Sequence, residues 1–557
     1  MDFILTLHSH LPYVLHHGRW PHGSDWLTEA AIDTYLPLLE VLQGFERDGV
    51  DAPITLGITP VLANQLSHPS FVSEMEAFFE HRIESAEEAP ESLRASNDAH
   101  LIPVAKFWED RLHRLRGLFR AVNGDLAHAF GEFQRRGRIE IISCAATHGF
   151  LPLLGCDESI RLQLFTGRNE HVRLFGRAPV GIWLPECAFR PAGPWTPPGY
   201  PPGAFRRGTD EFLRDAGYKF FFVDAHLVNA GGWLGRYHEI PLGTERFGAE
   251  RHALDDEPEQ VAERSAYKAY RMPDDGSGRP LMAFVRDPKS SLQVWSRWRG
   301  YPGDPNYLEF HKIRWPGGLK LWAVTGPETD LGDKVPYNPE WARGRAGDHA
   351  RHFASLLMGT ALGERGGQVI CAPFDTELFG HWWYEGVDFI NDLYRALQGM
   401  PVKPVSGKTH VARRFTRPVV RLTEGSWGAN GDFSFWMNDQ TKWSWERMWA
   451  LEQQYWAAAR PALRGSEGQR RVLEQATRSL LLAQASDWQF VISTGAAGDY
   501  ATKRLNLHFD DLERLLGALA PGADDGALEA GVRFAEEIRA RDDLFPNVLG
   551  SVEEALA

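Results

Sequence analysis

Seven short apolar runs are spread over the first 390 residues of this 557-residue chain, and polar residues follow each of them. Apolar runs of this length are typical of strands that are buried on both faces. Most of the intervals between them are long enough for a helix, and alternating strands and helices predict a parallel sheet. The carboxyl ends of such strands share one face, where α/β barrels hold their active sites. The runs lie at 3–7, 54–58, 139–144, 180–184, 220–223, 281–285 and 369–372.

The polar residues at these strand ends are the first candidates for chemistry. Glu186 follows an apolar run, so we expect it to be partly desolvated, which strengthens its interaction with a developing positive charge. The alternative is a structural ion pair with Arg190 or Arg286. The residues expected at this rim include His8, His10, His148, Glu186, Arg286 and Asp375.

Two carboxylates on different strands of one rim suit the cleavage of a glycosidic bond. One carboxylate attacks the anomeric carbon or stabilises its charge, and the other protonates the leaving oxygen. Glu186 and Asp375 are the pair that the strand ends offer. The 20 Trp residues of the chain favour a carbohydrate ligand, because flat aromatic faces match the C–H faces of sugar rings.

Charge and composition exclude several classes of partner. The formal net charge of -14 argues against nucleic acid, and no apolar stretch approaches the length of a membrane span. The four Cys include no CxxC pair and do not form a disulfide framework. No signal peptide is visible at the N-terminus, so we expect a cytoplasmic protein.

Histidines in HSHLPYV (8–14) and ATHGFLP (146–152) suit either hydrogen bonds to sugar hydroxyls or metal ligation. A metal site calls for further His, Asp or Cys at ligand spacing, which these motifs lack. We therefore expect no metal and no organic cofactor, and keep a metal-dependent polysaccharide deacetylase as an alternative.

The chain divides into three parts by pattern. Residues 1–400 are expected to form the barrel, with a helical insertion at about 69–137, an acidic stretch at 84–92 and a long lid loop at about 226–280. Residues 401–429 are a connecting segment with a loop that faces the substrate. Residues 430–557 are expected to be helical, with apolar 3/4 spacing over 444–460, 469–488, 505–519 and 526–541.

Taken together, these motifs resemble glycoside hydrolase family 57, and within it the 1,4-α-glucan branching enzymes. The HxHxPY start, WLPECA (183–188) and PFDTELFGHWW (373–383) resemble the ordered signature regions of that family. HGRWPHG (17–23), RDPKSSLQVWS (286–296), SWGANGDFSFW (426–436) and ASDWQF (485–490) resemble the branching-enzyme subgroup. The resemblance extends over nearly the whole chain.

The resemblance implies a (β/α)7 barrel followed by an all-helical C-terminal domain. It implies that Glu186 is the nucleophile and Asp375 the general acid/base. It also implies that Tyr267 or Tyr270, on the lid loop, shields the covalent intermediate from water. The implied glucan contacts are His8, His10, Trp20, His148, Arg286, Trp295, Trp427, Trp436 and Asp487.

The expected activity is therefore that of a retaining branching enzyme, which cuts an α-1,4 bond and transfers the chain to a 6-hydroxyl. Its partner is an α-glucan such as amylose or glycogen, and the sequence leaves monomer and homodimer open. An α-amylase or 4-α-glucanotransferase using the same carboxylates is the nearest alternative. A glucan-binding scaffold without catalysis is a further one.

Overall fold

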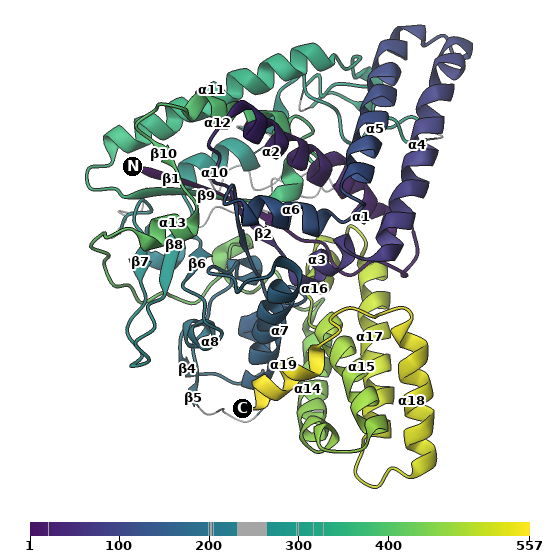
Figure 1. Cartoon of the computed structure of the whole chain (residues 1–557), viewed down its shortest axis with the longest axis vertical. Coiled ribbons are helices and arrows are strands. Elements are labelled where there is room, and N and C mark those ends of the chain that lie inside the picture. Colours follow the sequence, from purple (N-terminus) through teal and green to yellow (C-terminus); the bar gives the residue numbers. More distant parts are fainter. Residues whose placement is uncertain are drawn as a thin grey trace.

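The computed structural model describes residues 1–19, 22–198, 200, 203, 205–230, 264–296, 298, 300–315, 317–326 and 328–557. Trp20 and the centre of the predicted lid loop, residues 231–263, lie outside the described residues. Figure 1 shows two parts, a barrel built from the first three quarters of the chain and a group of helices from the last quarter.

Six of the seven predicted strands are present, and together with the fourth run they close into a parallel ring. β1 pairs with β2 and β9, β2 with β3, and β6 with β8. The fourth run makes only single bridges, Ser143 with Ile182 on one side and Gly181 with Phe220 on the other. A bridge between Arg286 and Cys371 closes the ring. The strands are β1 (Asp2–Ser9), β2 (Thr55–Ile58), β3 (Glu140–Ile142), β6 (Phe220–Val223), β8 (Met282–Val285) and β9 (Val369–Asp375).

Helices surround the ring and bury its outer face. Their starts follow the local sequence: Asp287 caps α10 through Lys289 N and Ser290 N, and Asn338 caps α11 through Glu340 N and Trp341 N, each with a proline next in sequence. The barrel helices are α1 (Ser24–Ala30), α2 (Leu36–Asp48), α3 (Pro60–Leu66), α6 (Leu126–Arg135), α7 (Asp157–Phe175), α8 (Thr209–Asp215), α10 (Pro288–Trp295), α11 (Pro339–Gly363), α12 (Gly386–Leu397) and α13 (Gly407–Ala412).

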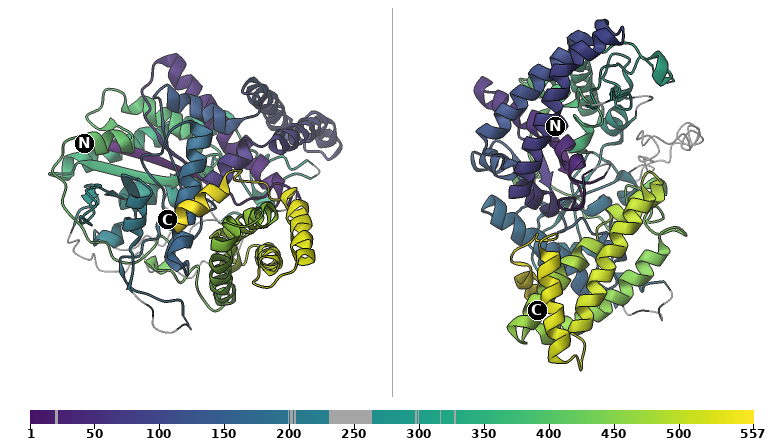
Figure 2. Two further views of the ribbon diagram at one scale, coloured as in Figure 1. Left: turned by 60° about the horizontal axis from the view of Figure 1, so that its bottom comes forward. Right: turned by 90° about the vertical axis from the view of Figure 1, so that its right-hand side faces the viewer.

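The predicted insertion contains two long paired helices, α4 (Pro69–Ala95) and α5 (Ile102–Ala121). They extend beyond the barrel at one end of the molecule, as both views in Figure 2 show. The acidic stretch lies on α4. Its glutamates are exposed, whereas Ala86 and Ala89 between them are buried. The stretch is therefore a solvated helix face.

The last part of the described chain is helical, and its end returns to the barrel. α19 lies against α7, where Glu554 bonds Arg168 and Asn169. The segment expected as a single helix over 469–488 is instead two helices, because the chain breaks at 484–486. The helices are α14 (Lys442–Leu463), α15 (Glu467–Ala483), α16 (Asp487–Thr494), α17 (Gly498–Ala518), α18 (Asp525–Arg539) and α19 (Val548–Leu556).

Four very short strands complete the described elements. β10 joins the start of β1, β7 runs antiparallel to β8, and β4 pairs with β5. None of the helices in the described part of the chain is long and apolar enough to cross a membrane. The short strands are β4 (Gly193–Pro194), β5 (Phe205–Arg206), β7 (Tyr270–Arg271) and β10 (Lys403–Pro404).

Candidate active site

A cavity of about 390 Å³ opens at the carboxyl ends of the barrel strands and is closed on one side by α16 and the start of α17. It is the place where the predicted residues of the barrel and of the helical part meet. The predicted residues that line it are His8, His10, His148, Glu186, Trp295, Asp375, Trp427 and Asp487.

Glu186 is buried and is held through both carboxylate oxygens. Trp427 Nε1 donates to its Oε2 at 2.8 Å, and Ser486 Oγ donates to its Oε1 at 3.0 Å. The backbone of Trp427 also donates to the Glu186 carbonyl at 3.0 Å. Glu186 has a left-handed backbone, with φ at 60°, which is a strained conformation for a non-glycine residue. The surroundings thus fix both the backbone and the carboxylate.

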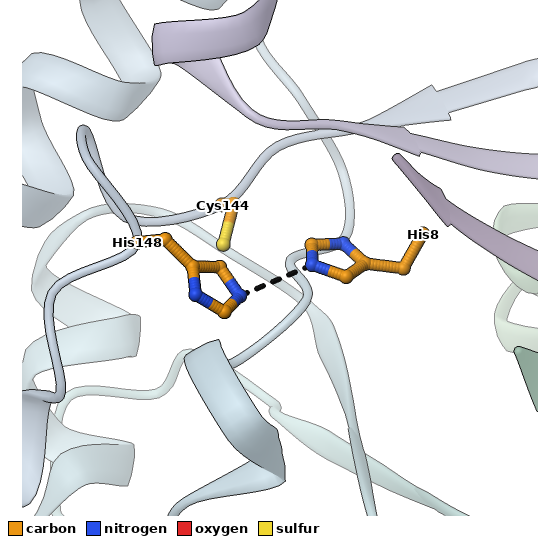
Figure 3. A group of neighbouring side chains, drawn as sticks. All are labelled: His8, Cys144 and His148. Atoms are coloured by element: carbon orange, nitrogen blue, oxygen red, sulfur yellow. Dashed lines mark hydrogen bonds between the residues drawn. The ribbon is translucent and has the colours of Figure 1, made fainter. Parts of the chain in front are cut away.

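His148 lies between Glu186 and the end of β1. Its Nδ1 is 2.8 Å from Ser486 Oγ and 3.7 Å from Glu186 Oε1, and its Nε2 is 3.1 Å from His8 Nε2. Figure 3 shows the two imidazoles facing each other, with the Cys144 thiol beside them. Burial, reinforced by His10 and His8, holds the pKa of His148 well below its usual value. His148 is therefore neutral at physiological pH.

His8, Cys144 and His148 have donor atoms of the kinds that bind metal ions. The ligand atoms of His8, Cys144 and His148 lie within 4.8 Å of one another. The facing ring nitrogens, however, already bond each other at 3.1 Å. Burial, together with the Glu186 and Asp487 carboxylates, raises the pKa of Cys144 and disfavours the thiolate that a metal requires. The arrangement favours hydrogen bonding, and the expected lack of a metal stays a prediction.

His10 connects the barrel to α16. Its Nε2 lies 3.0 Å from both carboxylate oxygens of Asp487, and its Nδ1 lies 3.1 Å from Thr59 Oγ1. Burial alone lowers the pKa of His10, but the charge of Asp487, with smaller contributions from Glu377 and Glu186, outweighs it and raises the pKa. His10 and Asp487 are therefore a partly buried pair at the edge of the cavity, in which the carboxylate favours the protonated histidine.

Asp375 stands at the end of β9, directly opposite His8 in the register with β1. Paired residues on neighbouring strands point to the same face, so both side chains reach the cavity. Glu377, two residues later, also lines the cavity. It accepts from the Tyr35 hydroxyl at 2.5 Å and from His10 N at 3.1 Å, and burial raises its pKa to about 8.

Aromatic rings make up much of the remaining cavity wall. Of the adjacent pair Trp382–Trp383, Trp382 lines the cavity and Trp383 is buried in the core. Rings and carboxylates in one cavity suit a polymer of sugars, whose rings stack and whose hydroxyls accept and donate hydrogen bonds. The other lining rings are Trp26, Trp295, Phe310, Trp427, Trp488, Phe490 and Tyr500.

The structure does not bring four predicted residues to the cavity. Trp436 is fully buried and packs on Phe150, with ring centres 4.7 Å apart, so it is a core residue and not a glucan platform. Arg286 is buried too and lies 3.7 Å from Asp224 and 6.0 Å from the centre of the Trp427 ring. It stands behind Trp427 and does not line the cavity.

The two tyrosines predicted as a shield also lie elsewhere. Tyr267 is buried and its hydroxyl donates to Asp287 at 3.1 Å. Tyr270 belongs to β7 and donates to the Ser265 carbonyl at 2.8 Å. Neither lines the cavity among the described residues, so the shielding role predicted for them is corrected to packing of the barrel wall.

Sequence reasoning missed Ser486 and the bond between Trp427 and Glu186. Ser486 was hidden because the periodicity placed it inside a helix, whereas it lies in the gap before α16. Its position next to Asp487 in ASDWQF was the available signal. Trp427 was expected to contact glucan, and it does line the cavity, but it is only 2% exposed and its indole N–H is bonded to Glu186.

Comparison with known proteins matches nearly the whole chain. The family model of glycosyl hydrolase family 57 matches residues 4–422, and the model described as 1,4-alpha-glucan branching enzyme, C-terminal, matches residues 444–551. A 1,4-alpha-glucan branching enzyme of Thermococcus kodakarensis is 37% identical over 553 residues, which are 98% of this chain and 77% of that protein. A probable 1,4-alpha-glucan branching enzyme of Mycobacterium tuberculosis is 31% identical over 98% of this chain and 96% of that protein.

Solved structures show the same likeness. A family 57 branching enzyme from Thermococcus kodakaraensis, crystallised with glucose, gives a TM-score of 0.88 at 36% identity and covers 99% of this chain and 96% of its own. The Pyrococcus horikoshii branching enzyme gives 0.87 at 34% identity, with the same shares covered. The α-amylase AmyC of Thermotoga maritima gives 0.77 at 28% identity and covers 98% of both chains. The chain therefore belongs to glycosyl hydrolase family 57.

Proposed function

We propose that this protein is a 1,4-α-glucan branching enzyme that works by the retaining mechanism. One observation carries the proposal. The break before α16, inside the region matched by the branching-enzyme C-terminal model, brings Ser486 and Asp487 to the cavity that holds Glu186 and Asp375. The branching-enzyme relatives support the same activity over the full length of the chain.

In this proposal the two carboxylates divide the chemistry. Glu186 attacks the anomeric carbon of an α-1,4-linked glucose while Asp375 gives its proton to the leaving glycosidic oxygen. The donor chain is then bound covalently to Glu186. Asp375, now ionised, takes the proton of a 6-hydroxyl on an acceptor chain, whose oxygen displaces Glu186 and forms the α-1,6 branch.

The surroundings of Glu186 support its role as the nucleophile. Each carboxylate oxygen has one strong donor, Trp427 Nε1 or Ser486 Oγ, and hydrogen bonds to a charged acceptor are stronger than neutral ones. Two fixed donors orient the carboxylate at the cavity. Because the ground-state position is already fixed, little reorganisation is needed during attack.

We further propose that His8, His10, His148, Trp295 and Asp487 contact the glucan, since they line the same cavity. We keep as a proposal the division into a barrel over 1–400, a connecting segment over 401–429 and a helical domain over 430–557. The connecting segment supports this division, because it pairs Gly425 with Phe189 and so carries Trp427 to Glu186.

Amylose and iodine give the first test. Branching shortens the linear runs, so iodine colour should fall with little rise in reducing ends, and new short chains should appear after enzymatic debranching. Glu186→Gln should abolish all three changes. Glu84→Gln, the same substitution on the exposed face of α4, should leave them intact. A loss of colour that is retained in Glu186→Gln would refute the assignment of the nucleophile.

Azide distinguishes the two carboxylates. In Glu186→Ala, azide should replace the missing nucleophile and give a β-glycosyl azide by single inversion. In Asp375→Ala, azide should attack the glycosyl-enzyme and give the α-glycosyl azide. An activated substrate such as a maltosyl fluoride avoids the need for acid catalysis in the first step. Exchanged anomers in the two variants would reverse the proposed roles.

The likeness to AmyC favours a second candidate, an α-amylase with the same carboxylates. The iodine assay separates the two activities, because hydrolysis raises reducing ends in proportion to the loss of colour. The deacetylase alternative requires a metal and would lose activity on exhaustive chelation. A binding scaffold would retain amylose without any turnover.

A further inference from the structure

Ser486 is the point at which the helical part touches the proposed nucleophile. It is fully buried, and its Oγ lies 3.0 Å from Glu186 Oε1 and 2.8 Å from His148 Nδ1. We infer that Ser486 is a positioning residue for Glu186, at the centre of a one-way chain of hydrogen bonds from His8 through His148 to the carboxylate. The inference rests on the proposed role of Glu186 as the nucleophile.

The direction of the chain follows from proton counting. A serine hydroxyl has one proton to donate, and an ionised carboxylate can only accept. The Ser486 proton therefore points to Glu186 Oε1, and the Ser486 oxygen accepts the Nδ1–H of His148. This assigns one tautomer to His148, with its proton on Nδ1.

The same reasoning extends to His8. His148 is neutral and carries its single ring proton on Nδ1, so its Nε2 must accept. The partner of that nitrogen is His8 Nε2, 3.1 Å away, which therefore donates (Figure 3). All three hydrogen bonds point towards Glu186, and aligned bonds of this kind polarise one another and favour the anion at the end.

Backbone contacts keep Ser486 in place. Its N–H donates to the His148 carbonyl at 3.1 Å, and the neighbouring residues Gly149 and Ala485 form an antiparallel bridge. Gln163 Nε2, on α7, donates to Oε1 of Gln484, the residue that follows α15, at 3.0 Å. The hydroxyl is thus carried by main chain that is anchored to the barrel, as a positioning group requires.

Removing the Ser486 hydroxyl should slow the attack by Glu186 and leave the rest of the cavity lining unchanged. Loss of one hydrogen bond to a charged acceptor corresponds to a fall of roughly 10- to 100-fold in kcat/KM for Ser486→Ala. With one donor fewer, the Glu186 anion is less stabilised, so the acidic limb of the pH profile should move to higher pH. Other titratable groups around Glu186 include His10, Cys144 and His148 from the barrel, and His8, Asp375, Glu377 and Asp487 line the same cavity.

The experiment compares Ser486→Ala with Ser486→Thr and with Ser479→Ala. Threonine restores a hydroxyl and should recover much of the rate and the wild-type pH profile. Ser479 is a buried serine of α15 whose Oγ has no hydrogen-bond partner among the described residues, so its removal should change neither. Each variant is assayed with a chromogenic maltooligosaccharide as the donor, and kcat and KM are recorded from acid to neutral pH.

A second measurement does not depend on turnover. In protein labelled with ¹⁵N-histidine, the resonances of His148, identified by their loss in His148→Gln, should show a neutral ring protonated at Nδ1. Ser486→Ala should shift or exchange-broaden that N–H signal, while Ser479→Ala should leave it unchanged. A His148 protonated at Nε2 in the wild type would overturn the inference whatever the kinetics.

The two proposals fail in different ways. If Glu186→Gln is inactive while Ser486→Ala keeps the wild-type kcat/KM and pH profile, the positioning role of Ser486 is wrong and the nucleophile stands. If Glu186→Gln remains active, the proposed function is wrong at that residue, and the inference, which rests on it, falls too.

Discussion

At the scale of single residues, the site is built from strained positions held by fixed partners. His148 and Glu186 both have left-handed backbones, with φ near 60°, in positions that L-residues rarely adopt. Each such residue costs on the order of 1–3 kcal/mol, so it persists only where its surroundings determine it. The bonds of Trp427 and Ser486 to Glu186, and of Ser486 to His148, are the surroundings that do so here.

Trp427→Phe tests the indole donor. It keeps most of the ring volume but removes the N–H that bonds Glu186 Oε2. We expect kcat/KM for donor cleavage to fall roughly 10- to 100-fold, the effect of one lost bond to a charged group, while the far-ultraviolet dichroism stays unchanged. Trp315→Phe, the same change at a residue that is 65% exposed, should leave the rate intact. Equal rates for both variants would exclude the Trp427 contact from catalysis.

Asp487→Asn tests the partly buried pair with His10. Because Asp487 raises the pKa of His10 in the folded state, the pair stabilises the protein fully below the unfolded histidine pKa of about 6.5. That stability is lost as the pH rises through the raised pKa. We therefore expect Asp487→Asn to lower the unfolding free energy by about 1–3 kcal/mol at mildly acidic pH and by less in alkali. Urea titrations across this pH range measure the unfolding free energy, with Asp439→Asn at an exposed position as the control. If the pair were uncharged, Asp487→Asn would lower the unfolding free energy equally at every pH.

At the scale of elements, strands were more predictable than helix ends. Six of the seven runs became barrel strands, because a fully buried parallel strand needs a continuous apolar run, which a sequence displays directly. The fourth run joins the ring through single bridges. The break between α15 and α16 carries no such sign. Ala485 and Ser486 fit a helix, and only their pairing with Gly149 and His148 on the barrel opens the chain there. Tertiary contacts therefore determine where α15 ends and α16 begins, which the apolar periodicity does not show.

The same contact explains the glycine of the THG motif and provides a test. A Cβ on Gly149 would lie 2.9 Å from the Gln163 side chain and 3.3 Å from the Gln484 carbonyl. Gly149→Ala should therefore lower the unfolding free energy by about 1–3 kcal/mol, the usual cost of overpacking. Gly359→Ala, on α11, where a Cβ meets nothing within 4 Å, should be neutral or slightly stabilising. Similar urea midpoints for both variants would contradict the close approach.

At the scale of the whole molecule, a buried polar network joins the two ends of the chain. The loop after β1 contacts the segment between α18 and α19, through Tyr13 with Asp543 and His17 with Asp542. Arg541 bonds Asp542 and Asp511 within the same group. Tyr13 and Asp543, and likewise His17 and Asp542, are more than 500 residues apart, and nothing in the spacing of the sequence connects them. The network places the helical part beside the loop after β1, which begins at His10.

Acid should weaken the polar network between the loop after β1 and the segment between α18 and α19. His17 is the titratable group in this network that allows a test. Burial lowers the pKa of His17 to about 4, against the favourable contact with Asp542. A histidine whose folded pKa is depressed stabilises the protein above the unfolded pKa of about 6.5, and this stability is lost as the pH falls towards the folded value. The difference corresponds to up to about 3 kcal/mol between these two pH values.

His17→Gln keeps an N–H donor for Asp542 but cannot titrate, so the unfolding midpoint should depend less steeply on pH between about 6.5 and 4 than in the wild type. Part of the slope should remain, because burial also holds the pKa of His508 well below its usual value. Urea unfolding followed by tryptophan fluorescence measures the slope. The exposed His81→Gln should reproduce the wild-type curve. If His17→Gln only shifts the curve without flattening it, His17 is not charged on unfolding in this range, and the acid sensitivity of the network lies with His508 or its carboxylates.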